Sequence, residues 1–283
     1  MIGDGLSWLQ FADRIGLNLF ALLTIGFALH AASGVVERAA FKSLRLRLAL
    51  VSMAFAFFVA IRVGILVAQM GNGSNPFDIE LLPLAWMALG DSTLLAIVGS
   101  LAAAGGVWLG SRIAAALGAI AISAGFGLTG HSQGLAEPGL APAMVAAHVL
   151  IAGFWIAAPL SLYPSKALSD SALLARLSRF SMVAVAAIPI LVGVGVWLAW
   201  ILTGGPEKLF GGTYGLLLLA KLAIGVVAMG LGALNKQIIT ARVAADPVAG
   251  RTWLRTTLLL EAGLFAAAIV AVSAATTIGG PTD

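Results

Sequence analysis

Long stretches without a charged residue recur along the whole chain, and this spacing constrains the fold more than any other feature. An α-helix needs about 20 mainly apolar residues to cross the hydrocarbon layer of a bilayer. Only 10% of the 283 residues are charged and 60% are hydrophobic, whereas soluble domains are about 25% charged. Such a chain cannot cover a globule with polar surface, so the sequence predicts an integral membrane protein.

Eight stretches are long and apolar enough to be membrane spans. They cover residues 14–36, 48–70, 91–110, 112–130, 141–163, 180–203, 214–235 and 255–278. Residues 79–90 are apolar but short and contain Pro83, so we expect an interfacial helix or the mouth of the third span. The sequence therefore predicts an all-α membrane protein, a bundle of eight transmembrane helices that forms one polytopic membrane domain over residues 1–283.

The basic residues predict the orientation of the bundle, because cytoplasmic loops carry an excess of Lys and Arg. Twelve of the sixteen lie in one set of loops: Arg38, Lys42, Arg45, Arg47, Arg112, Lys166, Arg176, Arg179, Lys236, Arg242, Arg251 and Arg255. The opposite loops hold only Arg14 and Lys208. We therefore expect the first set to face the cytoplasm and both termini to face outward.

Several classes of chemistry are excluded by residues that the chain lacks. There are no cysteines, so disulfides, zinc–thiolate sites and thiol catalysis are ruled out. No Walker sequence and no room for a nucleotide-binding domain are present. We therefore expect neither an ATP-driven pump nor an enzyme, and the loop positions of the basic residues do not indicate nucleic-acid binding.

Two histidines and a methionine are expected to lie around one outward-facing mouth. His131 follows the fourth span, and His148 lies two turns into the fifth. Met144 precedes His148 by one helical turn and shares its face, and Trp155 continues that face inward. Imidazole and thioether groups suit Cu(I), and imidazole also suits Cu(II). The alternative is that these are ordinary packing residues, since methionine is a common core filler.

Ionisable groups inside spans are costly, so each one is a candidate for function. Those within the expected spans, apart from His148, are His30, Arg62, Asp91, Lys221 and Glu261. One interpretation is that Arg62 or Lys221 pairs with Asp91 or Glu261 to fix helix packing. The other is a gating or proton-linked network. His30, in the inner half of the first span, is a candidate second site on a transit path or a packing histidine.

The second half of the chain resembles a known family. The stretch from Gly130-His131 to His148-Val-Leu-Ile-Ala-Gly-Phe-Trp155 is similar to the paired-histidine region of the CopD/PcoD copper-resistance membrane proteins. Tyr214 and Lys221 at the start of the seventh span, Asn235 at its end and Glu261 in the last span also follow the family pattern. The resemblance covers about residues 130–280. One departure is Trp155-Ile-Ala, where the family often has Trp-x-Gly.

The resemblance implies a bacterial inner-membrane protein that handles copper ions, Cu(I) or Cu(II), together with a periplasmic copper chaperone of the CopC type. Carried over by position, His131 and His148 are copper-site residues. Tyr214, Lys221, Asn235 and Glu261 have no assigned role. The hypothesis is a permease that imports copper from periplasm to cytoplasm. The alternatives are a non-transporting copper sensor or donor for periplasmic cuproproteins, and a membrane redox protein that holds b-type haem on two histidines.

Overall fold

The structure is a computed structural model that describes residues 5–71, 75–130, 133 and 137–278. Within these ranges all regular secondary structure is helical. The long helices are α1 (Gly5–Ser33), α2 (Phe41–Met70), α3 (Leu82–Leu109), α4 (Arg112–Gly127), α5 (Ala141–Ile156), α7 (Asp170–Thr203), α9 (Thr213–Leu234) and α11 (Pro247–Ile278). The short elements are η1 (Arg38–Ala40), α6 (Ala158–Ser161), α8 (Pro206–Gly211), η2 (Asn235–Ile239) and α10 (Thr240–Ala245).

Seven of these helical segments are long and apolar enough to cross a membrane, and the protein is an all-α, multi-pass membrane protein. The eighth expected span falls short, because α4 has 16 residues and is about 24 Å long at 1.5 Å per residue. The helix ends there because Leu128 leaves helical geometry and Gly130 adopts a positive φ of 84°. Other helices extend beyond the expected spans. The segment with Pro83 is the first turn of α3, and so forms the mouth of the third span.

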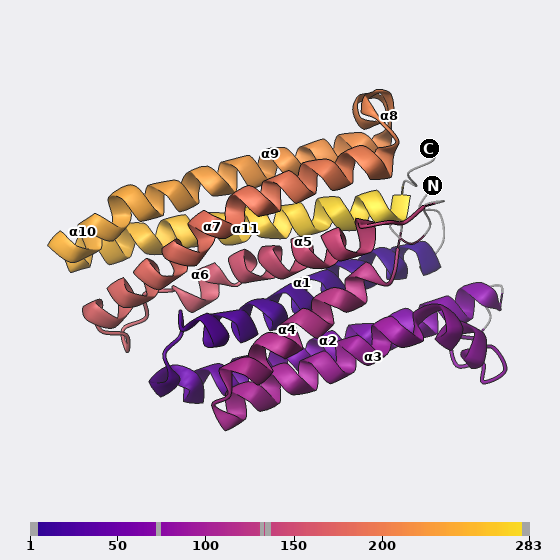
Figure 1. The fold of residues 1–283 in the computed structure, drawn as a ribbon, viewed down its shortest axis with the longest axis horizontal. Helices are drawn as coiled ribbons and strands as arrows, with labels where there is room; N and C mark the ends of the chain where they lie inside the picture. Colours follow the sequence, from indigo (N-terminus) through magenta and orange to yellow (C-terminus); the bar gives the residue numbers. More distant parts are fainter. Residues whose placement is uncertain (1–4, 72–74, 131–132, 134–136, 279–283) are drawn as a thin grey trace.

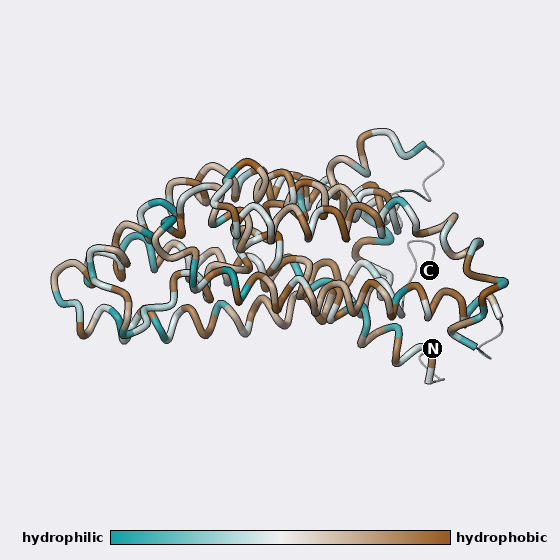
Figure 2. The backbone as a smooth tube through the Cα atoms, turned by 90° about the horizontal axis from the view of Figure 1, so that it is seen from below, coloured by the Kyte–Doolittle hydropathy of each residue, from teal (hydrophilic) through white to brown (hydrophobic). Residues whose placement is uncertain are grey.

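The long helices run alternately up and down, so their ends gather at two sides of the bundle (Figure 1). We call the side where α1 begins and α11 ends the N/C end. The opposite side, where η1, α6 and α10 lie, is the basic end. The hydrophobic segments lie mainly along the middle of the bundle, and most hydrophilic segments lie toward its two ends (Figure 2). This banding is what a protein whose middle faces hydrocarbon requires.

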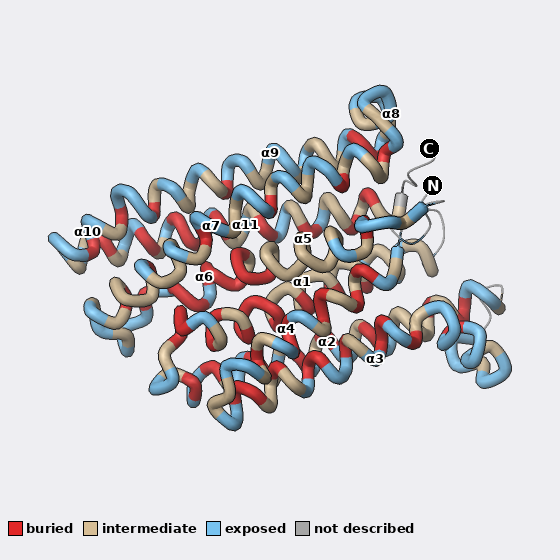
Figure 3. Tube along the Cα trace, in the orientation of Figure 1, coloured by how far each residue is buried: buried red, intermediate tan, exposed pale blue. Residues whose placement is uncertain are grey.

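The buried residues form two hydrophobic clusters that meet at α1 and α5. One cluster joins α1, α2, α3 and α4, and the other joins α5, α7, α9 and α11. The α1 helix contacts α2, α4, α5 and α11, and so ties the two halves together. In contrast to α1, the α9 helix is little buried, and Figure 3 shows it mostly exposed or intermediate along its length. Its exposed residues are leucines and valines such as Leu216, Val226 and Val227, as expected for a lipid-facing surface.

Glycines allow pairs of helices to touch backbone to backbone within the monomer. A Cβ on Gly118 of α4 would overlap the backbone of Gly99 and Ala103 on α3. A Cβ on Gly26 of α1 would overlap the carbonyl of Gly153 on α5. Small residues at such contacts are the usual way for membrane helices to pack, because burial of apolar surface supplies little driving force in lipid.

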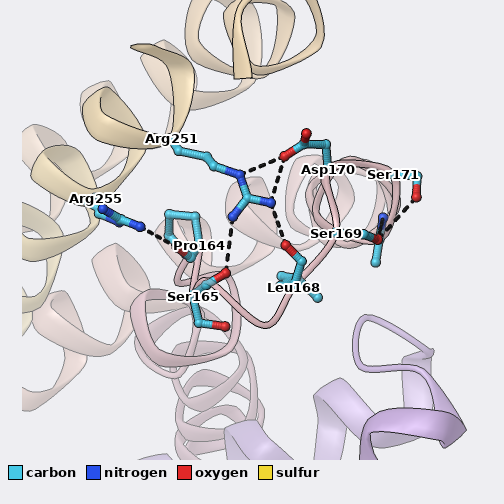
Figure 4. Close-up of polar contacts among 9 residues, drawn as sticks. Pro164, Ser165, Leu168, Ser169, Asp170, Ser171, Arg251 and Arg255 are labelled. Carbon is cyan, nitrogen blue, oxygen red and sulfur yellow. Dashed lines mark hydrogen bonds and ion pairs between the residues drawn. The ribbon is translucent and has the colours of Figure 1, made fainter. Parts of the chain in front are cut away.

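At the basic end, two arginines of α11 hold the connection between α6 and α7 (Figure 4). Arg251 donates hydrogen bonds to the carboxylate of Asp170 and to the carbonyls of Ser165 and Leu168. Arg255 donates to the carbonyl of Pro164 at 3.0 Å. Guanidinium groups that satisfy several carbonyls at once fix the end of the fifth span relative to the last one.

The glycine contacts predict different effects for the same substitution on two neighbouring helices, at Gly105 of α3 and Gly118 of α4. Gly118→Ala should lower the free energy of unfolding by about 1–3 kcal/mol, because the new methyl group meets backbone that cannot move aside. Gly105→Ala should be neutral or slightly stabilising, because nothing lies within 4 Å of the added Cβ and alanine favours the helix by about 0.5–1 kcal/mol. Thermal unfolding of the two variants in detergent measures both effects. Equal midpoints would contradict the packing of α4 on α3.

Candidate functional site

His148 and Lys221 meet between three helices near the N/C end. The Nζ atom of Lys221 on α9 lies 3.5 Å from Nε2 of His148 on α5. Nδ1 of His148 is buried and has no hydrogen-bond partner of good geometry among the described residues, although the backbone of Leu191 also interacts with the ring. Both side chains are half-buried. The arrangement is a partly enclosed imidazole whose Nε2 lone pair faces the Lys221 ammonium group, which leaves the ring proton on Nδ1.

A glycine of α7 makes room for this imidazole. A Cβ on Gly195 would lie 3.2 Å from Cε1 of His148 and 3.5 Å from Nδ1, so the ring rests against bare backbone. The His148 residue lies seven residues into α5, about 10 Å from its start, and Lys221 lies eight residues into α9, about 12 Å from its start. The two residues are therefore at matched depth below the N/C end.

Of the two other expected metal ligands, the structure describes Met144 but not His131. Met144 lies on α5, one turn closer to the N/C end than His148, and its side chain is half-buried. His131 lies outside the described residues. Among the residues that are described, no three His, Asp or Glu side chains come together as a metal-binding group.

A second polar cluster joins α9 and α11 toward the basic end. Asn235 donates a hydrogen bond from Nδ2 to Oε1 of Glu261, at 2.9 Å. Thr257 donates from Oγ1 to Oδ1 of Asn235, at 2.6 Å. All three residues are buried, with Glu261 only 2% exposed. The threonine hydroxyl fixes which way the amide faces, so Asn235 presents its N–H to the carboxyl group.

A π-helical segment begins at this cluster. Residues Asn235–Ile239 form η2, a single π-helical stretch between α9 and α10. The carbonyl of Asn235 accepts two hydrogen bonds from Thr240, one from its backbone N–H and one from its hydroxyl at 2.7 Å. Such segments are rare and often mark functional positions, because they rotate the residues on either side relative to a regular helix.

An aromatic pair separates the two polar clusters along the bundle. Trp155 on α5 and Phe265 on α11 are buried, with ring centroids 5.4 Å apart at 71°. Trp155 lies seven residues, about 10 Å, inward of His148. Lys221 and Asn235 are fourteen residues apart on the α9–η2 helix, about 21 Å. The aromatic rings therefore lie between the His148–Lys221 pair and the Asn235–Glu261 cluster.

His30 is fully buried at the basic end of α1, and both of its nitrogens are occupied. Nδ1 lies 2.7 Å from Oγ of Ser161, and Nε2 lies 2.8 Å from the carbonyl of Phe154. Because a carbonyl only accepts, Nε2 carries the proton and Nδ1 accepts from the serine. The rings of Phe154 and Phe180 contact the imidazole edge-to-face. A metal at His30 would have to break one of these hydrogen bonds.

The remaining charged residues do not pair as the sequence suggested. In the described part of the chain the salt bridges are Arg179–Glu37 and Arg251–Asp170, and neither Arg62 nor Lys221 reaches Asp91 or Glu261. Asp91 is exposed on α3. Arg62 instead interacts electrostatically with Asp13, a carboxylate only 3% exposed on α1.

Arg62 also lines a small cavity between the first four helices. The hydroxyl-bearing residues Ser92 and Thr93 of α3 contribute to the same lining, and Leu17 and Phe126 contribute apolar surface. Tyr214, which follows the family pattern, is buried in the first turn of α9. It lies two turns from Lys221 on the same helical face.

Sequence reasoning missed several of these partners. Thr257 precedes Glu261 by one helical turn, a spacing that predicts a shared face and that was visible in the sequence. Asp13 lies one residue outside the expected first span, which begins at residue 14. Gly195 and Ser161 gave no signal, because isolated small residues are frequent in membrane helices.

These features define a multi-pass helical membrane protein with polar groups held inside its spans. Residues 174–275, about a third of the chain, match the model of the CopD family, described as copper resistance protein D. The match confirms the expected resemblance to the CopD family over this segment. The segment includes Lys221, Asn235 and Glu261 but not His131, Met144 or His148. Comparisons with curated proteins and with solved structures gave no match.

The inner cluster predicts that a single hydroxyl group stabilises the fold. Thr257→Val removes the donor to Asn235 and leaves a buried amide oxygen unsatisfied, so the free energy of unfolding should fall by about 1–3 kcal/mol. The matched control is Thr256→Val, at an exposed position whose hydroxyl bonds only to its own helix. Thermal unfolding in detergent checks both variants. A control that is as destabilised as Thr257→Val would contradict the role given to the Asn235 contact.

Proposed function

We propose that the chain is a copper permease that imports copper ions from the periplasm to the cytoplasm without an energy source of its own. The observation that carries the proposal is the imidazole of His148, whose Nε2 lone pair faces the side chain of Lys221 inside a span, in a chain whose residues 174–275 match the CopD family. Imidazole binds Cu(I) and Cu(II), and a thioether binds Cu(I). Copper delivered to the outer mouth binds His148 with help from Met144. His131 is included in this site on the basis of the sequence alone, because it lies outside the described residues.

A small ligand set suits conduction, because an ion that is held by few groups can also leave. His148 lies about 10 Å below the N/C end. An ion therefore reaches it from the outer surface without an intermediate binding site. From there the ion moves inward between α5, α9 and α11. The Trp155–Phe265 pair lies across this route, so each passage requires these two rings to separate. Trp155 and Phe265 thereby act as a gate between the outer and inner polar clusters.

The Asn235–Glu261 cluster is the next polar position on this route. Glu261 makes no ion pair in the described part of the chain, and its carboxyl group accepts a hydrogen bond from Asn235. Carboxylate and amide oxygens are hard ligands that bind Cu(I) weakly. They therefore favour onward release of the ion rather than its storage.

The orientation follows from the positive-inside rule, which favours a cytoplasmic basic end and outward-facing termini in the bacterial inner membrane. With this topology α4 also crosses the bilayer, and because it is only about 24 Å long it requires a locally thinner hydrocarbon layer. The His148 site then opens to the periplasm. A periplasmic copper chaperone of the CopC type is the partner that we expect to load it.

A copper sensor or donor is the second candidate, since it would use the same outer site but need no inward route. The polar cluster at Asn235 and Glu261 favours the permease, because a donor has no use for ion-binding groups about 21 Å further inward. A haem protein is the third candidate. Purified protein distinguishes it, since b-type haem gives a Soret absorption band.

The first test measures Cu(I) uptake into proteoliposomes that contain a trapped copper indicator. Wild type should take up copper, and the His131→Ala/His148→Ala variant should lose at least nine-tenths of the rate, because the outer ligands are gone. His148→Ala alone should weaken copper binding at least tenfold while the protein still elutes as a single species. Copper that binds to wild type in stoichiometric amount without uptake would refute the permease and favour the donor.

Methionine variants provide a matched control. Met144→Leu should weaken Cu(I) binding by several-fold, because a thioether one turn from His148 is lost. Met182→Leu, at a position 70% exposed on α7, should leave it unchanged. Equal Cu(I) affinities of the two variants would show that Met144 is not a ligand of the site.

A further inference from the structure

Lys221 lies inside a membrane span and makes no ion pair with a carboxylate of the described residues. Neither salt bridge of the described residues includes it, and α9 contains no acidic residue. Glu261, on the neighbouring α11, lies near Asn235, about 21 Å further along α9. The one polar side chain that meets the ammonium group in the described part of the chain is His148. Intramembrane cations without an acidic partner are costly and mark functional positions.

The contact occupies the atom that a metal ion needs. An ammonium group has only donors, so Lys221 donates an N–H to Nε2 and His148 accepts with its lone pair. A metal ion binds imidazole through the same lone pair. Copper and Lys221 therefore cannot both use Nε2, and two cations at this separation in a partly enclosed site repel each other.

We propose that Lys221 is the resident cation of the His148 site, which copper displaces when it binds and which returns when copper leaves inward. The inference rests on the proposed function, since it concerns how that site exchanges its ion. Returning to Nε2, the ammonium group blocks the ion from stepping back. Because repulsion grows with the charge of the ion, Lys221 also disfavours Cu(II) relative to Cu(I).

The geometry leaves room for this exchange. Lysine has a flexible four-carbon stem, so its ammonium group swings away without a change in the helix. Gly195 places bare backbone on the side of Nδ1 and Cε1, so the ring keeps its position when Lys221 moves. Lys221 is only partly buried, so its stem is not sealed inside the core.

The test compares Cu(I) affinities of purified protein, measured by competition with a chromogenic Cu(I) chelator. Lys221→Met should bind Cu(I) at least tenfold more tightly than wild type, because the competing cation is gone. Lys221→Arg keeps the charge and should remain within a few-fold of wild type. Lys208→Met, which removes a lysine from the exposed helix α8, is the matched control and should have no effect. Unchanged or weaker binding in Lys221→Met would overturn the proposal.

Transport provides the second readout. In proteoliposomes, Lys221→Met should take up copper at least several-fold more slowly than wild type despite its tighter binding, since release is no longer assisted. Faster or equal uptake would overturn the proposal. If Lys221→Met fails to elute as a single species, Lys221→Gln is measured in its place.

The two proposals fail in different ways. If His148→Ala still binds copper, the copper site is wrongly assigned and the proposed function fails with it. Copper binding that is lost in His148→Ala but unchanged in Lys221→Met leaves the site in place and removes only the role of Lys221. A ¹⁵N spectrum of labelled histidine gives a copper-free check, since Nε2 of His148 should shift when Lys221 is replaced. An unshifted signal would refute the contact.

Discussion

The backbone contact between α1 and α5 is the interaction on which the positions of His30, Trp155 and His148 depend. Gly26 and Gly153 bring the two helices so close that neither position has room for a side chain. One residue after Gly153, the Phe154 carbonyl meets His30, and on the next residue Trp155 turns toward α11. The same rotation of α5 directs His148 toward α7 and α9. A membrane protein gains little from burial of apolar surface, so close packing of this kind has to fix the helices.

The polar groups inside the bundle differ in how completely they are hydrogen-bonded. Those that hold the fold have complete sets of partners, as His30 has with Ser161 and Phe154, and as Arg251 has with the α6–α7 connection. The His148–Lys221 pair is less complete, since Nδ1 of His148 has no hydrogen bond of good geometry and Lys221 has no carboxylate partner among the described residues. Because unsatisfied polar groups are costly away from water, this pair is a candidate for function.

The sequence predicted an all-α membrane bundle and the order of its apolar helices, because the length of an uncharged run reflects the thickness of the bilayer. It predicted eight spans, whereas seven helical segments in the described part of the chain are long and apolar enough to cross a membrane. It did not predict their ends, and Asp13 was placed outside the first span although α1 begins at Gly5 and buries it. Nor did it predict which charges meet, since this depends on how each helix is rotated against its neighbours. The pairing of His148 with Lys221 joins residues 73 apart in the chain and has no local pattern. The contact of Thr257 with Asn235 and Glu261 is the exception, because Thr257 and Glu261 are one turn apart.

The chemical difference between the two clusters has a consequence for any ion that moves between them. The outer one offers nitrogen and sulfur, and the inner one offers oxygen from Glu261, Asn235 and Thr257. Cu(I) prefers the first set, so its affinity falls as it moves inward. The Trp155–Phe265 pair lies between and has no group that holds an ion. An ion on this route therefore crosses one barrier from a stronger site to a weaker one, and the bulk copper gradient has to supply the difference in free energy. The repulsion from Lys221 reduces that difference, because it raises the free energy of the bound ion at the outer site alone.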